Sequence, residues 1–243
     1  MFQKFIKLTK IVTGNHNTIA MQTIEIPNQS FNRPVIGLEQ LFIRRIPYWK
    51  RGMDIVGAIV GLVLFMPVML AVVIAIKLTS KGPAIFKQKR VGQEGKPFIL
   101  YKFRSMFLGA EDKKKELMKF NERTGPTFKM TADPRVTPIG KLIRKWSLDE
   151  LPQFYNVLKG DMSLVGPRPP TTDEVPKYDN WQNRRLEVKP GITCIWQISA
   201  RHKSSFEEWI RLDIDYVRRQ SFLLDLKILF LTLPAVLSKK GAH

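Results

Sequence analysis

The sequence is poor in the residues that build disulfides and metal centres. It has one cysteine and three histidines among 243 residues. Cys194 lacks a partner for an intramolecular disulfide, which excludes a disulfide-stabilised scaffold. The histidines, at positions 16, 202 and 243, show no metal-ligand spacing with it, so no zinc site is predicted. The patterns GxxxxGK[ST] and GxGxxG are also absent, so neither common phosphate-binding loop is predicted.

Acidic residues are few relative to basic ones. Lys and Arg number 40 against 21 for Asp and Glu, a formal net charge of +19. Such a charge indicates an anionic partner: nucleic acid, anionic lipid or a phosphorylated substrate. No nucleic-acid-binding module is visible, so we expect no nucleic-acid partner. A non-catalytic basic protein that binds membrane surfaces or nucleic acid is the alternative to an enzyme.

One long apolar segment predicts membrane contact. Residues 55–76 carry no charge, and a helix of this length reaches ~33 Å, enough to cross a bilayer core. Pro67 removes a helical hydrogen bond and favours a kink. Basic residues flank both ends, which favours a re-entrant helix that enters and leaves at the cytoplasmic face. A single-span anchor is the alternative. We also expect Asp54, at the edge of this segment, to pair with Lys50 or Arg51.

Three regions follow from this segment. Residues 1–47 are predicted to be a weakly ordered or peripheral extension, with no cleaved signal peptide. Residues 48–77 form the membrane helix, and residues 78–243 form a catalytic domain. Within 83–106 the alternation of apolar and polar residues around GQEGK predicts a β-hairpin. Ser205 and Glu208 form a capping-box pattern before an amphipathic helix. The apolar residues 222–237 fit either an interfacial helix or a core helix. The fold class is therefore mostly α with a small β-hairpin, in a monotopic membrane protein.

Two adjacent carboxylates, Asp149 and Glu150, are the candidate reactive groups. Ser147 and Glu150 match a capping box, whereas Pro152 favours a helix that Leu151 caps. In either register the two carboxylates lie at or just before a helix N-terminus. The helix dipole and a nearby arginine, Arg144, then favour ionisation of both. Adjacent helical side chains point ~100° apart, so one carboxylate could hold a cation such as Mg²⁺ while the other attacks or takes a proton. An acidic pair that only caps a helix is the simpler interpretation.

Several cations lie beside turn residues rather than in charge runs, which suits the binding of phosphate oxygens. These predicted phosphate-binding residues are Lys102, Arg104, Arg135, Arg144, Arg168 and Arg201. Arg168 lies in GPRPP, where prolines fix the backbone. Together with the carboxylate pair and the membrane segment, they suggest phosphoryl chemistry on a lipid phosphate.

Five consecutive segments resemble the bacterial sugar transferase family, the monotopic phosphoglycosyl transferases. In order they are KRGMDIVGAIVGLVLFMPVM, GPAIFKQKRVG, YKFRSM, DPRVTPIGKLIRKWSLDELPQFYNVLKGDMSLVGPRPP and KPGITCIWQISAR. The sequence departs from the family pattern at Met66, Cys194 and Ala200, where Ser, Gly and Gly are common. The last two departures fall in the region expected to contact sugar or nucleotide.

The resemblance implies transfer of a sugar-1-phosphate from a UDP-sugar donor to polyprenyl phosphate, typically undecaprenyl phosphate, with release of UMP. This is the first membrane step of exopolysaccharide, capsule or O-antigen (lipopolysaccharide) assembly. It implies that Asp149 is the nucleophile of a covalent phosphosugar intermediate and that Glu150 helps to hold Mg²⁺. Arg144 and Arg168 are expected near phosphate groups, and Pro67 at the helix kink. The implied location is the cytoplasmic face of the bacterial inner membrane.

Overall fold

In this computed structural model, the structure describes residues 5–13, 16–24, 46–122, 125–199 and 205–237. The chain divides into two units, Met1–Leu41 and Phe42–His243. In the first, β1 (Phe5–Thr13) pairs antiparallel with β2 (His16–Ile24). The sequence analysis did not predict these strands, because the segment has no strict alternation. It is nevertheless rich in Ile, Val and Thr, which favour extended backbone.

The second unit is mostly helical with a small β-hairpin, as predicted, and it also has a two-stranded parallel sheet that was not predicted. Its helices are α1 (Tyr48–Thr79), α2 (Lys114–Leu117), α3 (Pro138–Lys145), α4 (Gln153–Lys159), α5 (Ile195–Ser199), α6 (Phe206–Arg219) and α7 (Phe222–Leu237). Strands β3 (Ile85–Val91) and β4 (Pro97–Phe103) form the predicted hairpin, and β5 (Ser163–Val165) pairs in parallel with β6 (Gly191–Thr193). Short 3₁₀ turns lie at Gln93–Gly95, Met118–Phe120, Leu148–Glu150, Val175–Lys177 and Gln182–Glu187.

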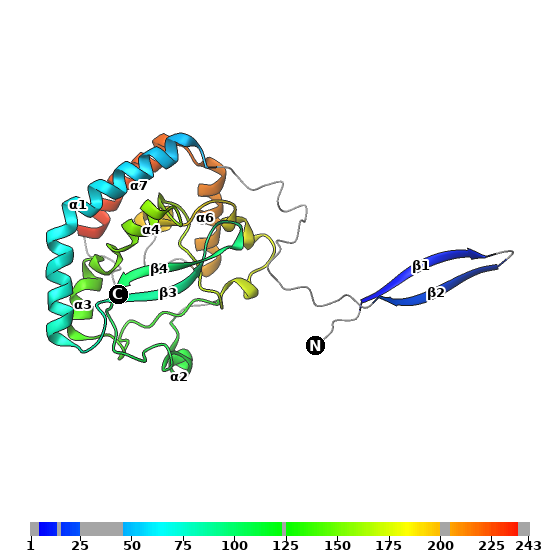
Figure 1. Cartoon of the computed structure of the whole chain (residues 1–243), viewed down its shortest axis with the longest axis horizontal. Helices are drawn as coiled ribbons and strands as arrows, with labels where there is room; N and C mark the ends of the chain where they lie inside the picture. The colour runs from blue at the N-terminus through cyan, green and yellow to red at the C-terminus, as the bar shows by residue number, and fades with distance from the viewer. Residues whose placement is uncertain (1–4, 14–15, 25–45, 123–124, 200–204, 238–243) are drawn as a thin grey trace. The chain divides into compact units, whose positions relative to one another are not determined.

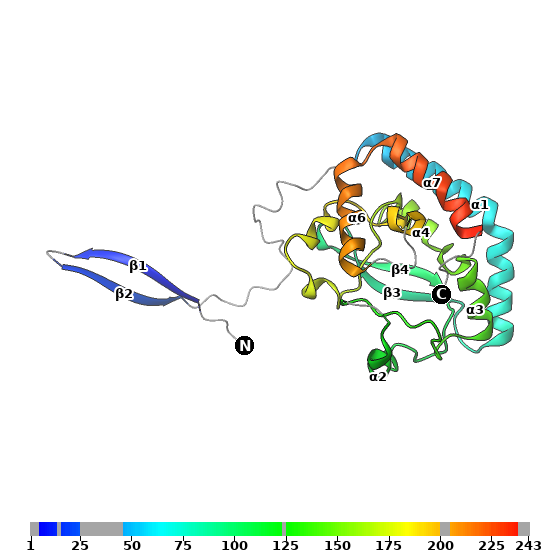
Figure 2. The same ribbon diagram turned by 180° about the vertical axis from the view of Figure 1, so that it is seen from behind.

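Helix α1 lies along the outside of this unit and changes direction along its length (Figures 1 and 2). It is long and apolar enough to cross a membrane, and it extends slightly beyond the predicted range. Large apolar side chains such as Val63, Leu64 and Leu70 are about three-fifths exposed. A surface of this kind is typical of a helix that contacts lipid. The architecture is therefore consistent with a monotopic membrane protein.

The inner face of α1 packs against the rest of this unit. Figures 1 and 2 show α7 beside one part of α1 and α3 beside another. A Cβ atom at Gly61 would lie 2.7 Å from Cζ of Phe154, so only glycine lets α4 approach this closely. A core cluster of Ala58, Leu100 and Val157 joins α1 to β4 and α4, and α6 and α7 contribute to the same cluster.

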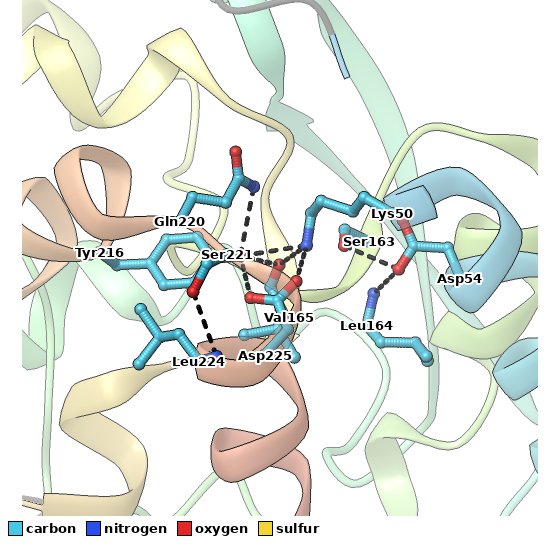
Figure 3. Close-up of polar contacts among 10 residues, drawn as sticks. All are labelled: Lys50, Asp54, Ser163, Leu164, Val165, Tyr216, Gln220, Ser221, Leu224 and Asp225. Carbon is cyan, nitrogen blue, oxygen red and sulfur yellow. Dashed lines mark hydrogen bonds and ion pairs between the residues drawn. The ribbon is translucent and has the colours of Figure 1, made fainter. Parts of the chain in front are cut away.

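The start of α1 is tied to the body by buried polar contacts (Figure 3). Lys50 Nζ lies 2.5 Å from Asp225 of α7, 3.0 Å from the Tyr216 hydroxyl and 2.9 Å from the Val165 carbonyl oxygen. The Tyr216 hydroxyl in turn lies 2.8 Å from Asp225 and 3.0 Å from the same carbonyl. All three side chains are buried, so this group joins α1, α6 and α7 to β5.

The predicted pairing of Asp54 with Lys50 or Arg51 is wrong. Asp54 accepts hydrogen bonds of 2.8 Å from the Ser163 hydroxyl and the Leu164 amide of β5. Arg51 donates instead to two carbonyl oxygens of α4, at Val157 and Leu158. The prediction considered only neighbours within one helical turn, whereas Asp54 and Arg51 each bind a group more than a hundred residues away.

The structure confirms the predicted capping box of α6, and α7 combines features of both alternatives considered for residues 222–237. Ser205 and Glu208 make both bonds of a capping box at the start of α6. In α7, Asp225 and Ile228 are buried whereas Leu223 and Phe230 are largely exposed. One face of α7 therefore belongs to the core, and the other presents an apolar surface.

Candidate active site

The two candidate carboxylates lie on a short turn between two helices. Asp149 and Glu150 belong to the 3₁₀ turn Leu148–Glu150, after α3 and before α4. Ser147 precedes them in the left-handed region, with φ of 54°, and its side chain makes no capping bond. The predicted capping box is therefore wrong, because a left-handed Ser147 turns the chain at this point. Leu151 is not the cap either, since α4 begins at Gln153 after Pro152.

A pocket of about 470 Å³ gathers most of the predicted site residues. Both carboxylates line it, and so do Lys102, Arg104, Arg135, Arg144 and Arg168. These residues come from β4, from the segment around α3 and from the loop after β5. Arg201 lies outside the described residues. The whole lining has nine cationic and five acidic side chains, an excess of positive charge that suits a polyanionic ligand.

Glu150 is already surrounded by positive charge. Its Oε1 atom lies 2.8 Å from Lys102 Nζ and 3.9 Å from Arg168 Nη1. Arg168 keeps 37% of its side chain exposed, so its guanidinium is accessible from the pocket. A phosphate that enters the pocket would contact Lys102 and Arg168, which both lie beside the Glu150 carboxylate.

Two of the predicted phosphate-binding cations also make hydrogen bonds with other residues of the protein. Arg104 donates to the carbonyl oxygens of Ser80 and Lys81, just after α1. Arg135 binds Asp133 through two nitrogens and donates to the Ala110 carbonyl oxygen. Both arginines are buried, so each stabilises the wall of the pocket. Their predicted contact with phosphate stays a prediction.

The electrostatic setting of Asp149 differs from the expectation. Burial raises the pKa of Asp149 to about 6, with a further contribution from the charge of Glu150. The positive charges of Lys102 and Arg144 oppose this shift but do not outweigh it. We predicted that a helix dipole and Arg144 favour ionisation; Arg144 does act in that direction, but it does not offset the burial of the carboxyl group. Asp149 still remains mostly ionised at pH 7.

Two further arginines in the pocket wall, Arg90 and Arg185, were missed. Both are buried. Burial, together with the charge of Arg168, lowers the pKa of Arg90 to about 10, so Arg90 remains charged at neutral pH. Arg90 lies in an alternating strand and Arg185 in the run NRR, and neither position signals burial in the sequence.

The fold and the site together indicate a class of protein. A mostly helical body carries a long, largely uncovered apolar helix, and the same body contains a pocket with an acidic pair and several cations. These are features of a membrane-associated protein that handles an anionic ligand. The bacterial sugar transferase family matches residues 45–239, and the chain belongs to that family.

Three relatives illustrate the similarity. The galactosyl transferase CpsE of Streptococcus agalactiae is 55% identical over 79% of this chain and 43% of the relative. The undecaprenyl-phosphate galactose phosphotransferase of Salmonella typhimurium is 42% identical over 81% of this chain and 42% of the relative. The exopolysaccharide production protein ExoY of Rhizobium meliloti is 38% identical over 80% of this chain and 88% of its own length. The matched region thus spans less than half of the first two relatives.

Proposed function

We propose that this protein transfers a sugar-1-phosphate from a UDP-sugar to undecaprenyl phosphate, releasing UMP. The observation that carries the proposal is the pocket in which Asp149 and Glu150 lie among cations that suit a diphosphate. Membership of the bacterial sugar transferase family supports it. The names of the Salmonella and streptococcal relatives also support it, and they make UDP-galactose the first donor to test.

The proposed reaction has two steps, each at the same phosphorus atom. A carboxylate oxygen of Asp149 attacks the phosphorus that bears the sugar, and the bond to the UMP oxygen breaks. This leaves the sugar phosphate on Asp149 as an acyl phosphate. An oxygen of the lipid phosphate then attacks the same phosphorus and releases the Asp149 carboxylate. Arg144, Arg168 and Lys102 bind phosphate oxygens during both steps.

The residues present fit a magnesium ion that is shared with the substrate. Among the described residues, no group of three or more acidic, His or Cys side chains could form a metal cage. Mg²⁺ commonly binds one or two carboxylates together with substrate phosphates, and the pocket offers Glu150 beside Asp149. When bound, Mg²⁺ neutralises charge on the diphosphate and on the leaving group. Glu150 is proposed as its protein ligand.

The decisive experiment measures UMP release from a panel of UDP-sugars. We expect release that depends on both Mg²⁺ and polyprenyl phosphate, with one donor favoured. A protein that only binds membranes or nucleic acid would release no UMP from any donor. No release across galactose, glucose and N-acetylated donors would therefore contradict the proposed function.

The pKa of Asp149 predicts the acid limb of the pH–rate profile. Only the ionised carboxylate can attack phosphorus, and its pKa is raised to about 6. We therefore expect the rate of UMP release to fall tenfold per pH unit below about pH 6. The measurement is kcat/KM for the donor between pH 5 and 8. A profile that stays flat down to about pH 5 would contradict the assignment.

We further propose that α1 is re-entrant at the cytoplasmic face of the inner membrane, with the apolar face of α7 lying in the interface. Pro67 lies inside α1 and has no amide hydrogen, so the Val63 carbonyl loses its helical donor. Single cysteines at residues 20 and 120, introduced after Cys194→Ser, should label from the same side of the membrane in intact cells. Pro67→Ala should shift the balance towards spanning. If, in the protein that keeps Pro67, the two positions label from opposite sides of the membrane, α1 spans the membrane.

A further inference from the structure

The loop that presents Arg168 is held through its backbone. Residues 166–170 read GPRPP, and the three prolines have no amide hydrogen to donate. Every carbonyl oxygen from residue 167 to residue 170 nevertheless accepts a hydrogen bond from another element. The donors, in that order, are the Gly191 amide at 2.9 Å, Arg185 Nη2 at 2.7 Å, Arg90 Nη1 at 2.9 Å and the Val91 amide at 3.0 Å.

Two of these donors are buried arginine side chains that approach from different elements. Arg90 lies on β3, where the Gln88 side-chain oxygen accepts from two of its nitrogens at 2.9 and 2.7 Å. Arg185 lies on the 3₁₀ turn Gln182–Glu187. Its Nη2 atom lies 2.5 Å from Asp213 of α6, and its Nη1 atom donates to the Tyr178 hydroxyl at 2.9 Å. Side chains outside the loop therefore hold each guanidinium group in place.

We propose that Arg90 and Arg185 are positioning residues that set where the Arg168 guanidinium lies in the pocket. They fix the carbonyl groups of Arg168 itself and of the next residue, Pro169. The Arg168 side chain then leaves a rigid backbone and reaches to 3.9 Å from Glu150. The inference rests on the proposed function in one respect, namely that Arg168 binds a phosphate of the donor.

The planar fork of arginine is what this arrangement uses. Arg185 contacts a carboxylate, a hydroxyl and a carbonyl at once, through two terminal nitrogens. A lysine would keep the charge beside Asp213 but offers one nitrogen at a different reach. The loop would lose the hydrogen bond to the Arg168 carbonyl oxygen, whereas the net charge of the pocket would stay the same. Misplacement of a binding group by about 1 Å can cost on the order of a hundredfold in rate.

The test is a double-mutant cycle between Arg185→Lys and Arg168→Lys. The readouts are the dissociation constant for UDP, which needs no turnover, and kcat and KM for the donor. We expect each single variant to weaken UDP binding by about tenfold, and the double variant to be no weaker than Arg168→Lys within about twofold, because one acts through the other. Arg184→Lys is the matched control, because Arg184 is half exposed and pairs with Glu187. It should leave UDP binding unchanged.

Additive losses in the double variant would overturn the proposal, since Arg185 would then act independently of Arg168. Unchanged UDP binding in Arg185→Lys, with only a lower melting temperature, would overturn it as well. If Arg185→Lys does not fold, Arg90→Lys gives the same cycle from the other side of the loop. Wild-type protein that binds UDP but releases no UMP would contradict the proposed function, whereas the cycle on UDP binding would still decide the positioning role.

Discussion

Asp149→Asn is expected to abolish sugar-phosphate transfer, with turnover reduced by about 10⁴-fold or more, as for other removed nucleophiles. The change is nearly isosteric, so the protein should fold and bind donor. With wild-type protein and no lipid acceptor, a donor labelled in its sugar phosphate should leave label on the chain. The variant should trap none, because an amide cannot form the acyl phosphate.

Asp215→Asn provides the control for this experiment. Asp215 lies on α6 outside the pocket lining, pairs with Arg219 and is partly exposed, so the same change there should leave both turnover and trapping intact. Label trapped on Asp149→Asn would mean that the nucleophile is another residue. A wild-type protein that never traps label and follows ternary-complex kinetics would leave Asp149 as a general base for direct attack by the lipid phosphate.

Lys50→Met is expected to lower the free energy of unfolding by about 3–5 kcal/mol, the usual effect of removing one partner of a buried ion pair. The variant leaves the Asp225 carboxylate buried, with the Tyr216 hydroxyl still beside it. Denaturant unfolding in detergent, followed by tryptophan fluorescence, measures the change. Lys50→Met combined with Asp225→Leu should recover much of the loss, because no unpaired charge remains and Tyr216 can still donate to the Val165 carbonyl oxygen.

The same substitution at Lys159 is the control. Lys159 pairs with Asp161 at 3.0 Å on the surface, with half of its side chain exposed. Exposed pairs contribute roughly 0–1 kcal/mol, so Lys159→Met should change the unfolding free energy little. Equal effects at the two lysines would show that the Lys50 cluster contributes no more than a surface contact.

The elements that the sequence predicted are those whose signals are local. The β3–β4 hairpin follows from alternation around a turn, and α6 begins at the Ser205–Glu208 capping box. The apolar run predicted α1, and the search for turn-flanked cations beside an acidic pair found residues of which all but Arg201 line the pocket. In each case, a few neighbouring residues contain the physical reason for the structure.

The features that the sequence did not predict depend on contacts between distant residues. Lys50 and Asp54 look like partners one helical turn apart, yet each binds a group more than a hundred residues away. The pKa of Asp149 rises because the folded protein partly shields the carboxylate from water, an effect that adjacent charges in the sequence do not reveal. Arg90 and Arg185 look like surface residues until the fold brings them against consecutive carbonyl groups of one loop.

The separation of Lys50 from Asp225 also has a consequence for biosynthesis. The two residues are 175 positions apart, and ribosomes add ~5–20 residues per second. Lys50 is therefore made roughly 10 to 35 s before its partner, while α1 is already apolar enough to seek the bilayer. During that interval, lipid phosphates or water must solvate the ammonium group. The buried pair can close only once α7 has been translated, so the start of α1 gains its last anchor to the rest of the protein late in synthesis.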